Sequence, residues 1–304
     1  MIIMRSKIIT YLLLSCITAT TVQAQQIFKI SQFVQHNFLY NPAAAGASDR
    51  ASVGSVVRTM WADMEGGPKT FIAYGDKFFD KQKVGVSAVV YSDKTGPTLR
   101  NGGNLNLSYA VKVGENRRVQ FGLGAHLLQF RIDHAKIASA IPNDPLLAAP
   151  ATSFKGDANA GVYYKSPTLN VGISAMQLIQ PKLNIIKGTN GEDNSGKLYR
   201  HYFFTANYNY RVDDETVLTP NFLFKYLPNA PLEFEGGVQL MYKDFIWVGG
   251  NYHYQQEYSI FAGIMIENQF SIGYSYDRYN TPADLFTGGN AGHELTLRYF
   301  FNKK

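Results

Sequence analysis

Cysteine, tryptophan and long apolar runs are scarce in this sequence: one cysteine and two tryptophans occur among 304 residues. Cys16 is the only cysteine, and it precedes the expected mature chain. That chain therefore has no disulfide framework, thiol nucleophile or thiolate metal site. No mature segment offers the roughly 20 apolar residues that a membrane helix needs. A membrane location would therefore require β-strands.

The N-terminus has the three regions of a secretory signal peptide. Basic residues precede an apolar run at 8–14, and a small, polar stretch ends at Ala24. Small residues at the −3 and −1 positions predict cleavage between Ala24 and Gln25. A rival interpretation is a lipoprotein signal ending at Cys16, which the preceding residues fit poorly. Cleavage after Ala24 leaves 304 − 24 = 280 residues, with 27 − 23 = +4 as the net charge. This small excess does not indicate nucleic acid.

The closing segment, residues 292–301, alternates strictly between apolar and polar side chains. Leu295 and Leu297 fall on one face, and Glu294 and Arg298 fall on the other. Such alternation predicts a strand with one apolar and one polar face. An aromatic residue near the end of the strand suits a transmembrane β-barrel, although a soluble sandwich strand has a similar pattern.

Similar segments recur along the chain and predict an all-β, antiparallel transmembrane barrel of about fourteen strands. We expect the barrel to occupy residues 51–304, after a signal peptide at 1–24 and a periplasmic lead-in at 25–50. The expected strands cover residues 51–60, 69–78, 82–91, 104–113, 119–130, 155–165, 169–177, 199–211, 216–227, 232–243, 245–254, 257–267, 269–277 and 292–301.

The connections between these strands differ in length on the two sides. One set of alternate connections is uniformly short, as expected of periplasmic turns. The other set is longer, except for two short connections near Pro228 and Gln255. This sorting favours an outer-membrane barrel over a soluble β-protein. The expected long outward loops cover residues 61–68, 92–103, 131–154, 179–198 and 278–291.

Two groups of residues are candidates for functional roles. Gly-Pro turns in successive outward loops predict a plug or a surface for docking a partner, although turn chemistry alone can also explain them. This group comprises Trp61, Gly67, Pro68, Lys69, Asp93, Gly96 and Pro97. Charges on the polar faces of strands are candidates to line a pore or to pair inside a filled barrel. These lumen candidates are Glu233, Glu235, Asp277, Glu294 and Arg298.

The sequence offers little evidence of catalysis or metal binding. His126 and His134 are the best candidate bases, but no Gly-x-Ser-x-Gly sequence accompanies them. The remaining histidines lack metal-ligand spacing. The polar segment 188–196 loosely suggests a calcium loop, yet it lacks the spaced acids and terminal glutamate of an EF-hand. We therefore expect no enzyme activity, cofactor or bound metal.

Several short motifs, in order along almost the whole mature chain, resemble those of a known family. They include Ser31-Gln32-Phe33, Asn41-Pro42-Ala43-Ala44-Ala45-Gly46, Arg58, Trp61, Gly67-Pro68-Lys69-Thr70, Asp93, Gly96-Pro97, Asp144-Pro145, the segment 154–164, Arg200-His201-Tyr202, Pro220, Lys225-Tyr226, Pro228, Gly273-Tyr274-Ser275-Tyr276-Asp277 and His293-Glu294. The chain thus resembles the PorP/SprF membrane proteins of the type IX secretion system of Bacteroidetes.

The resemblance implies an outer-membrane barrel that assists secretion or surface attachment of particular cargo proteins, such as gliding adhesins. Its implied partners are other type IX secretion components, cargo C-terminal domains and outer-membrane lipid. Any link to the cell wall would run through a separate, peptidoglycan-linked periplasmic protein. Two alternatives stay open: a solute or fatty-acid channel, since fourteen strands can enclose a lumen, and a barrel enzyme such as a lipase.

Overall fold

A computed structural model describes residues 27–142, 147, 152–183, 196–228, 230–280 and 291–302. The predicted cleavage site at Ala24 and Gln25 lies outside these residues, as do the Asp144-Pro145 motif and nearly all of the calcium-like segment 188–196. Within the described residues, no helix is both long and apolar enough to span a membrane.

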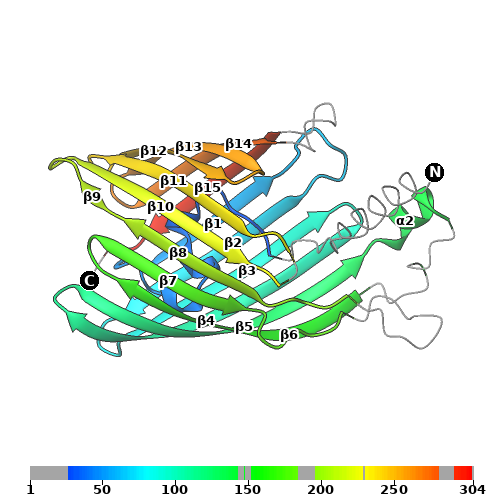
Figure 1. The fold of residues 1–304 in the computed structure, drawn as a ribbon, viewed down its shortest axis with the longest axis horizontal. Helices are drawn as coiled ribbons and strands as arrows, with labels where there is room; N and C mark the ends of the chain where they lie inside the picture. Colours follow the sequence, from blue (N-terminus) through cyan, green and yellow to red (C-terminus); the bar gives the residue numbers. More distant parts are fainter. Residues whose placement is uncertain are drawn as a thin grey trace, which may run out of the picture.

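The chain forms one closed antiparallel barrel (Figure 1). Each strand pairs with its sequence neighbour, β1 pairs with β15, and β10 pairs with both β8 and β11. The short strand β9 continues β8 alongside β10, so the two together count as one strand of a fourteen-stranded barrel. This confirms the predicted fold class. The strands are β1 Ser52–Thr59, β2 Lys69–Phe79, β3 Val84–Thr95, β4 Thr98–Gly114, β5 Arg117–Ile132, β6 Thr152–Lys165, β7 Leu169–Met176, β8 His201–Tyr208, β9 Tyr210–Arg211, β10 Thr216–Tyr226, β11 Glu233–Tyr242, β12 Ile246–His253, β13 Glu257–Ile266, β14 Phe270–Tyr279 and β15 Ala291–Phe300.

The two faces of the strands differ in polarity, as the alternation in the sequence predicts. On β5, Leu123 and Leu127 are 69% and 71% exposed, so they face the surrounding lipid. On β15, Glu294, Thr296 and Arg298 are buried inside the barrel. This arrangement places apolar side chains in hydrocarbon and polar side chains in the lumen, as in other outer-membrane barrels.

The turns at one end of the barrel contain four residues or fewer, whereas several connections at the other end are long. We call these the short-turn end and the long-loop end. The predicted loop at 92–103 is wrong, because β3 and β4 continue to a two-residue turn at Gly96-Pro97. Gly96 has a φ of 55°, which a tight hairpin tolerates at glycine. Gly102, inside the expected loop, lies on β4 and makes room for the ring of Tyr91.

The segment that precedes β1 lies inside the barrel. Residues 27–50 form three short 3-10 helices, η1 Phe33–Gln35, η2 Asn37–Leu39 and η3 Pro42–Ala44, and we call this segment the plug. Its apolar side chains form the main hydrophobic cluster with inward side chains of the wall, including Ile72, Val89 and Phe203. The segment was expected to lie on the periplasmic side, and this expectation was wrong. Its apolar side chains pack against inward apolar side chains of the wall, which keeps residues 30–46 inside the lumen.

Two glycines of the wall allow the plug to approach closely. A Cβ atom at Gly122 on β5 would overlap the backbone of Ala43, and one at Gly85 on β3 would overlap the carbonyl of Ala45. The plug enters near the long-loop end and reaches the short-turn end at Gly46, close to Lys77 and Phe78. It then continues into β1. One short helix, α2 His134–Ala140, follows β5 at the long-loop end.

Candidate functional site

A cluster of buried charges lies where the plug meets the wall near the long-loop end. Arg58 of β1 is 1% exposed and occupies its centre. Its guanidinium lies 3.0 Å from Glu294 Oε2 on β15 and 3.0 Å from Asp277 Oδ2 on β14. Glu257 Oε1 at the start of β13 is 3.4 Å away. We call Lys29, Arg58, Glu235, Glu257, Asp277 and Glu294 the charge cluster.

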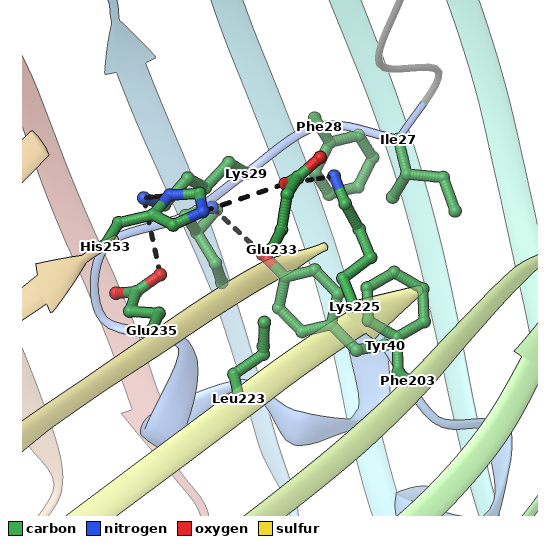
Figure 2. Close-up of a pocket in the computed structure, with 11 residues that line it drawn as sticks. Ile27, Phe28, Lys29, Tyr40, Phe203, Leu223, Lys225, Glu233, Glu235 and His253 are labelled. Atoms are coloured by element: carbon green, nitrogen blue, oxygen red, sulfur yellow. Dashed lines mark hydrogen bonds and ion pairs between the residues drawn. The ribbon is translucent and has the colours of Figure 1, made fainter. Parts of the chain in front are cut away.

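Lys29 is the contribution of the plug to this cluster. Its Nζ lies 2.6 Å from Glu257 Oε1, 3.3 Å from Glu235 Oε2 and 2.6 Å from His253 Nδ1. Figure 2 shows Lys29, Glu235 and His253 converging from the plug and from β11 and β12. Burial disfavours the charged amine, but the two carboxylates outweigh it and raise the pKa of Lys29. Lys29 is therefore a cation held by the wall.

The wall also binds the main chain of the plug beside Lys29. The carboxylate of Glu294 accepts the backbone N–H groups of Ser31 at 2.7 Å and Gln32 at 3.1 Å. The amide of Asn251 donates to the Ser31 carbonyl at 2.8 Å. The Ser31 hydroxyl donates to Asp277 at 2.8 Å and accepts from Arg58. One cluster thus satisfies both its own charges and the polar backbone of the plug.

Side chains farther down the wall hold the rest of the plug in the same way. Ser174 donates to the carbonyl of Tyr40 at 2.5 Å. Ser108 and Gln120 both donate to the carbonyl of Ala45, at 2.8 and 3.0 Å. Asp76 accepts the N–H of Gly46 at 2.6 Å. Backbone groups buried without partners are costly, so these bonds make an irregular segment stable inside a barrel.

Asn41 explains the Asn-Pro motif of the plug. Its side-chain oxygen accepts the N–H of Ala43 at 2.9 Å and so caps η3, whose first residue is Pro42. Its amide nitrogen donates to the carbonyls of Val162 on β6 and Ile173 on β7, at 3.0 and 3.3 Å. One side chain therefore both shapes the plug and attaches it to the wall.

All five predicted lumen charges face the interior, and three of them belong to the charge cluster. Glu235, Asp277 and Glu294 lie there, whereas Glu233 pairs with Lys225 on β10 at 2.6 Å. Arg298 lies apart, donating to the Gln35 carbonyl at 2.9 Å and to Ser52 at 3.0 Å. Each of these charges thus has a partner in the barrel wall, in the plug or in both.

Lys29, Arg58 and Glu257 were not among the predicted lumen charges. The inward register of β1, in which Ser52, Val56 and Arg58 share a face, was a signal for Arg58. Nothing in the period-two pattern indicated Lys29, because the plug has no regular period.

Some of the predicted docking residues lie in two turns at the long-loop end, the β1–β2 connection at 60–68 and the β3–β4 turn at 96–97, which we call the platform. The others lie on strands. Trp61, Gly67 and Pro68 lie in the β1–β2 connection, which is joined to the next turn by a hydrogen bond from the Gly96 N–H to the Gly66 carbonyl at 2.8 Å. Pro97 completes that turn. Lys69 and Asp93 instead belong to β2 and β3, and Asp93 is paired inside the barrel with Arg100 at 2.7 Å. The plug is formed by the N-terminal segment, and docking on these turns stays a prediction.

The candidate catalytic histidines are not brought together. His126 is buried on β5, with Nε2 2.8 Å from the hydroxyl of Tyr91. His134 begins α2, beyond the end of that strand. In the part of the chain that the structure describes, no group of three or more His, Cys, Asp or Glu side chains is placed to hold a metal ion.

Solved structures resemble this fold at very low sequence identity. A deletion mutant of the monoaromatic hydrocarbon channel TodX is 9% identical, with a TM-score of 0.51 over 88% of this chain and 94% of that one. The monoaromatic hydrocarbon channel CymD is 10% identical, with a TM-score of 0.50 over 93% and 95%. The toluene transporter TodX of P. putida is 8% identical, with a TM-score of 0.50 over 87% and 93%. These likenesses support the barrel fold alone.

The family comparison covers nearly the whole sequence, whereas the comparison with curated proteins gives no match. Residues 22–299 match the family described as type IX secretion system membrane protein PorP/SprF. This range includes the plug and every strand of the barrel up to the last residues of β15. The chain belongs to the PorP/SprF family and is an outer-membrane component of the type IX secretion system.

Proposed function

We propose that this barrel is a passive, non-enzymatic docking component that assists secretion or surface attachment of specific cargo proteins, such as gliding adhesins. The observation that carries the proposal is the plug, which the wall binds along the length of the lumen. A barrel whose interior is occupied by its own chain is suited to present surfaces to partners. Energy for transport would come from elsewhere in the secretion machine.

The contacts of the plug argue against a simple solute conduit. Residues 29–32 are bound by strands β1 and β11–β15, whereas η3 packs against β3–β7. The plug therefore bridges opposite sides of the barrel. Removing it would expose the charge cluster and the buried apolar cluster together, and separating buried ion pairs is strongly unfavourable.

The long-loop end offers the surface on which cargo would dock. There the β1–β2 and β3–β4 turns are hydrogen-bonded to each other, and the ring of Trp61 lies against Tyr279 with centroids 6.3 Å apart. A rigid platform loses less conformational entropy on binding than a free loop does. We assign cargo C-terminal domains to this platform, and other secretion components, including a peptidoglycan-linked periplasmic protein, to the opposite end.

The test is the surface and secreted proteome of a strain that lacks this gene, compared with its parent. The proposal expects one or a few large proteins to disappear from the surface and accumulate in the periplasm. Loss of every exported substrate would instead place the barrel in the core of the machine. An unchanged proteome would contradict the proposal.

The channel alternative has its own measurement. The purified chain in planar bilayers should show no steady conductance while the plug is seated. A wild-type protein that conducts ions steadily, or that a strain needs for growth on a particular solute, would favour the channel instead.

A further inference from the structure

The short-turn half of the lumen contains a cavity beneath the plug, and we call it the vestibule. Its volume is about 310 Å³, at the lower end of the range of small-molecule sites. Inward side chains near the short-turn ends of several strands form one side of it. The plug forms the other side through Val34, Gln35, Asn37, Phe38, Ala44, Ala47 and Ser48. Six uncharged polar side chains of the strands and turns line the vestibule: Tyr163, Asn170, Asn207, Asn209, Thr219 and Gln239.

Neutral hydrogen-bonding groups dominate this wall. Asn170 donates to Asn207 Oδ1 at 2.7 Å, and Thr219 donates to Asn209 Oδ1 at 3.2 Å. Asn170 is 5% exposed, and its Oδ1 has no hydrogen-bond partner among the described residues. Buried polar atoms are nearly always paired, so an unpaired amide oxygen in a cavity wall indicates a place for a donor from a ligand.

Two of the three charged side chains that line the vestibule already have partners in the protein. Asp76 accepts from the N–H of Gly46, and Arg298 donates to Gln35 and Ser52. The third, Lys165 at the end of β6, lies near Asp49 but makes no hydrogen bond or ion pair with another described residue. The free wall therefore offers an amine as well as amides. An amide side chain offers a donor and an acceptor together, which matches the alternating N–H and C=O groups of an extended peptide.

The barrel already binds a peptide in this way. Higher in the lumen, Asn251 donates to the carbonyl of Ser31, and Asn106 donates to that of Phe38 at 3.4 Å. Ser and Gln side chains hold the Ala45 carbonyl in the same manner. An oligosaccharide is less well matched, because it needs an open aromatic face. The rings of Trp247 and Tyr163 are covered, with exposures of 1% and 3%.

We propose that the vestibule binds an extended polar peptide segment of another protein, entering from the short-turn side. In an outer-membrane barrel that side faces the periplasm. The inference goes beyond the proposed function, because it does not depend on cargo or on the platform at the other end.

Phage display of random dodecapeptides against the detergent-purified full chain tests this inference. We expect selected peptides to be rich in Asn, Gln, Ser, Thr and Gly. Their affinity, measured by fluorescence anisotropy of the labelled peptide, should fall at least tenfold in the Asn170→Leu, Gln239→Leu double variant. Asn101→Leu, which removes an amide on the outer face of β4 near the β3–β4 turn, is the control and should leave the affinity unchanged.

Circular dichroism and heat-dependent gel mobility would verify that each variant forms the barrel. Selection of no peptide above bare detergent micelles, or equal binding by the double variant, would overturn the inference. Binding of chitotetraose that depends on Asn170 and Gln239, without peptide binding, would also overturn it. Because the assay contains no cargo, its result is separate from the fate of the proposed function.

Discussion

In the half of the lumen next to the long-loop end, the plug packs against the charge cluster and leaves little space. The half next to the short-turn end contains the vestibule, which is lined mainly by neutral side chains. Beside Lys29 the remaining cavity measures about 20 Å³, room for about one water. The vestibule measures about 310 Å³. This difference indicates that the long-loop half holds the plug in place, whereas the short-turn half has room for a peptide from another protein. Changes to the two halves should therefore have unequal effects.

Arg58→Met should have the largest effect on stability. The substitution leaves Glu257, Asp277 and Glu294 buried without the guanidinium that joins them, and breaking such a network costs about 3–5 kcal/mol. Urea unfolding of the protein in detergent micelles would measure it. Arg100→Met is the control, since Arg100 is partly exposed and pairs with Asp93. An equal loss in both variants would contradict a special role for the cluster.

Acid should destabilise the plug through His36. Burial, reinforced by the nearby Arg298 guanidinium, lowers the pKa of His36 to about 3. Between the unfolded pKa of about 6.5 and this value, only the unfolded state binds the proton. Stability therefore falls as the pH falls, by about 1.4 kcal/mol per pH unit, or about 2–3 kcal/mol at pH 4.5.

The measurement for His36 is the change in urea-unfolding free energy between pH 7 and pH 4.5. His36→Gln keeps a polar group near the Gln32 carbonyl and the Tyr74 hydroxyl but cannot titrate in this range. The loss on acidification should be smaller in this variant by the amount given above. Equal losses in both proteins would show that His36 is not buried in the neutral form.

Gly122→Val should displace the plug with a moderate effect. The new side chain would overlap the backbone of Ala43, and such overpacking typically costs about 1–3 kcal/mol. We expect a lower free energy of unfolding and intermittent ion conductance in planar bilayers. Gly156→Val adds a side chain on the lipid-exposed face of β6, where its Cβ meets only Leu127 Cδ2 at 3.9 Å, and should change neither. If Gly122→Val changes neither the unfolding free energy nor the conductance, η3 does not pack closely against β5.

Gln239→Leu in the vestibule should have the smallest effect. Its Oε1 accepts one long hydrogen bond of 3.4 Å from Gln35, so its loss should change the unfolding free energy by less than about 1 kcal/mol. The same urea titration measures this. A loss as large as that of Arg58→Met would remove the distinction between the two halves.

The sequence predicted the strands well because period-two alternation is a local property. Each of the fourteen strands, and the inward direction of Glu294 and Arg298, followed from that pattern. The hairpin at Gly96-Pro97 was missed because residues 92–103 were expected to form an outward loop, whereas Gly102 lies on β4 and makes room for the Tyr91 ring of β3. Only the pairing of strands shows that role.

The plug could not be predicted for a different reason. Residues 27–50 have no period, and their stability depends on partners distant in sequence. Lys29 meets Glu257 and Glu235, each more than 200 residues away, and no local signal encodes that contact. The family motif Asn41-Pro42 marked the segment, but its function as a cap and wall anchor became visible only in the barrel.

The most direct test of the account locks the plug in place and then measures secretion. Ser31→Cys and Asp277→Cys replace side chains that are 2.8 Å apart in plug and wall, in a mature chain expected to have no other cysteine. Surface proteomics would compare cells before and after oxidation, with reduction as the internal control. If the barrel is a passive docking component, oxidised cells keep their surface cargo. Cargo lost on oxidation and restored by reduction would show that the plug must leave the lumen, contradicting the account.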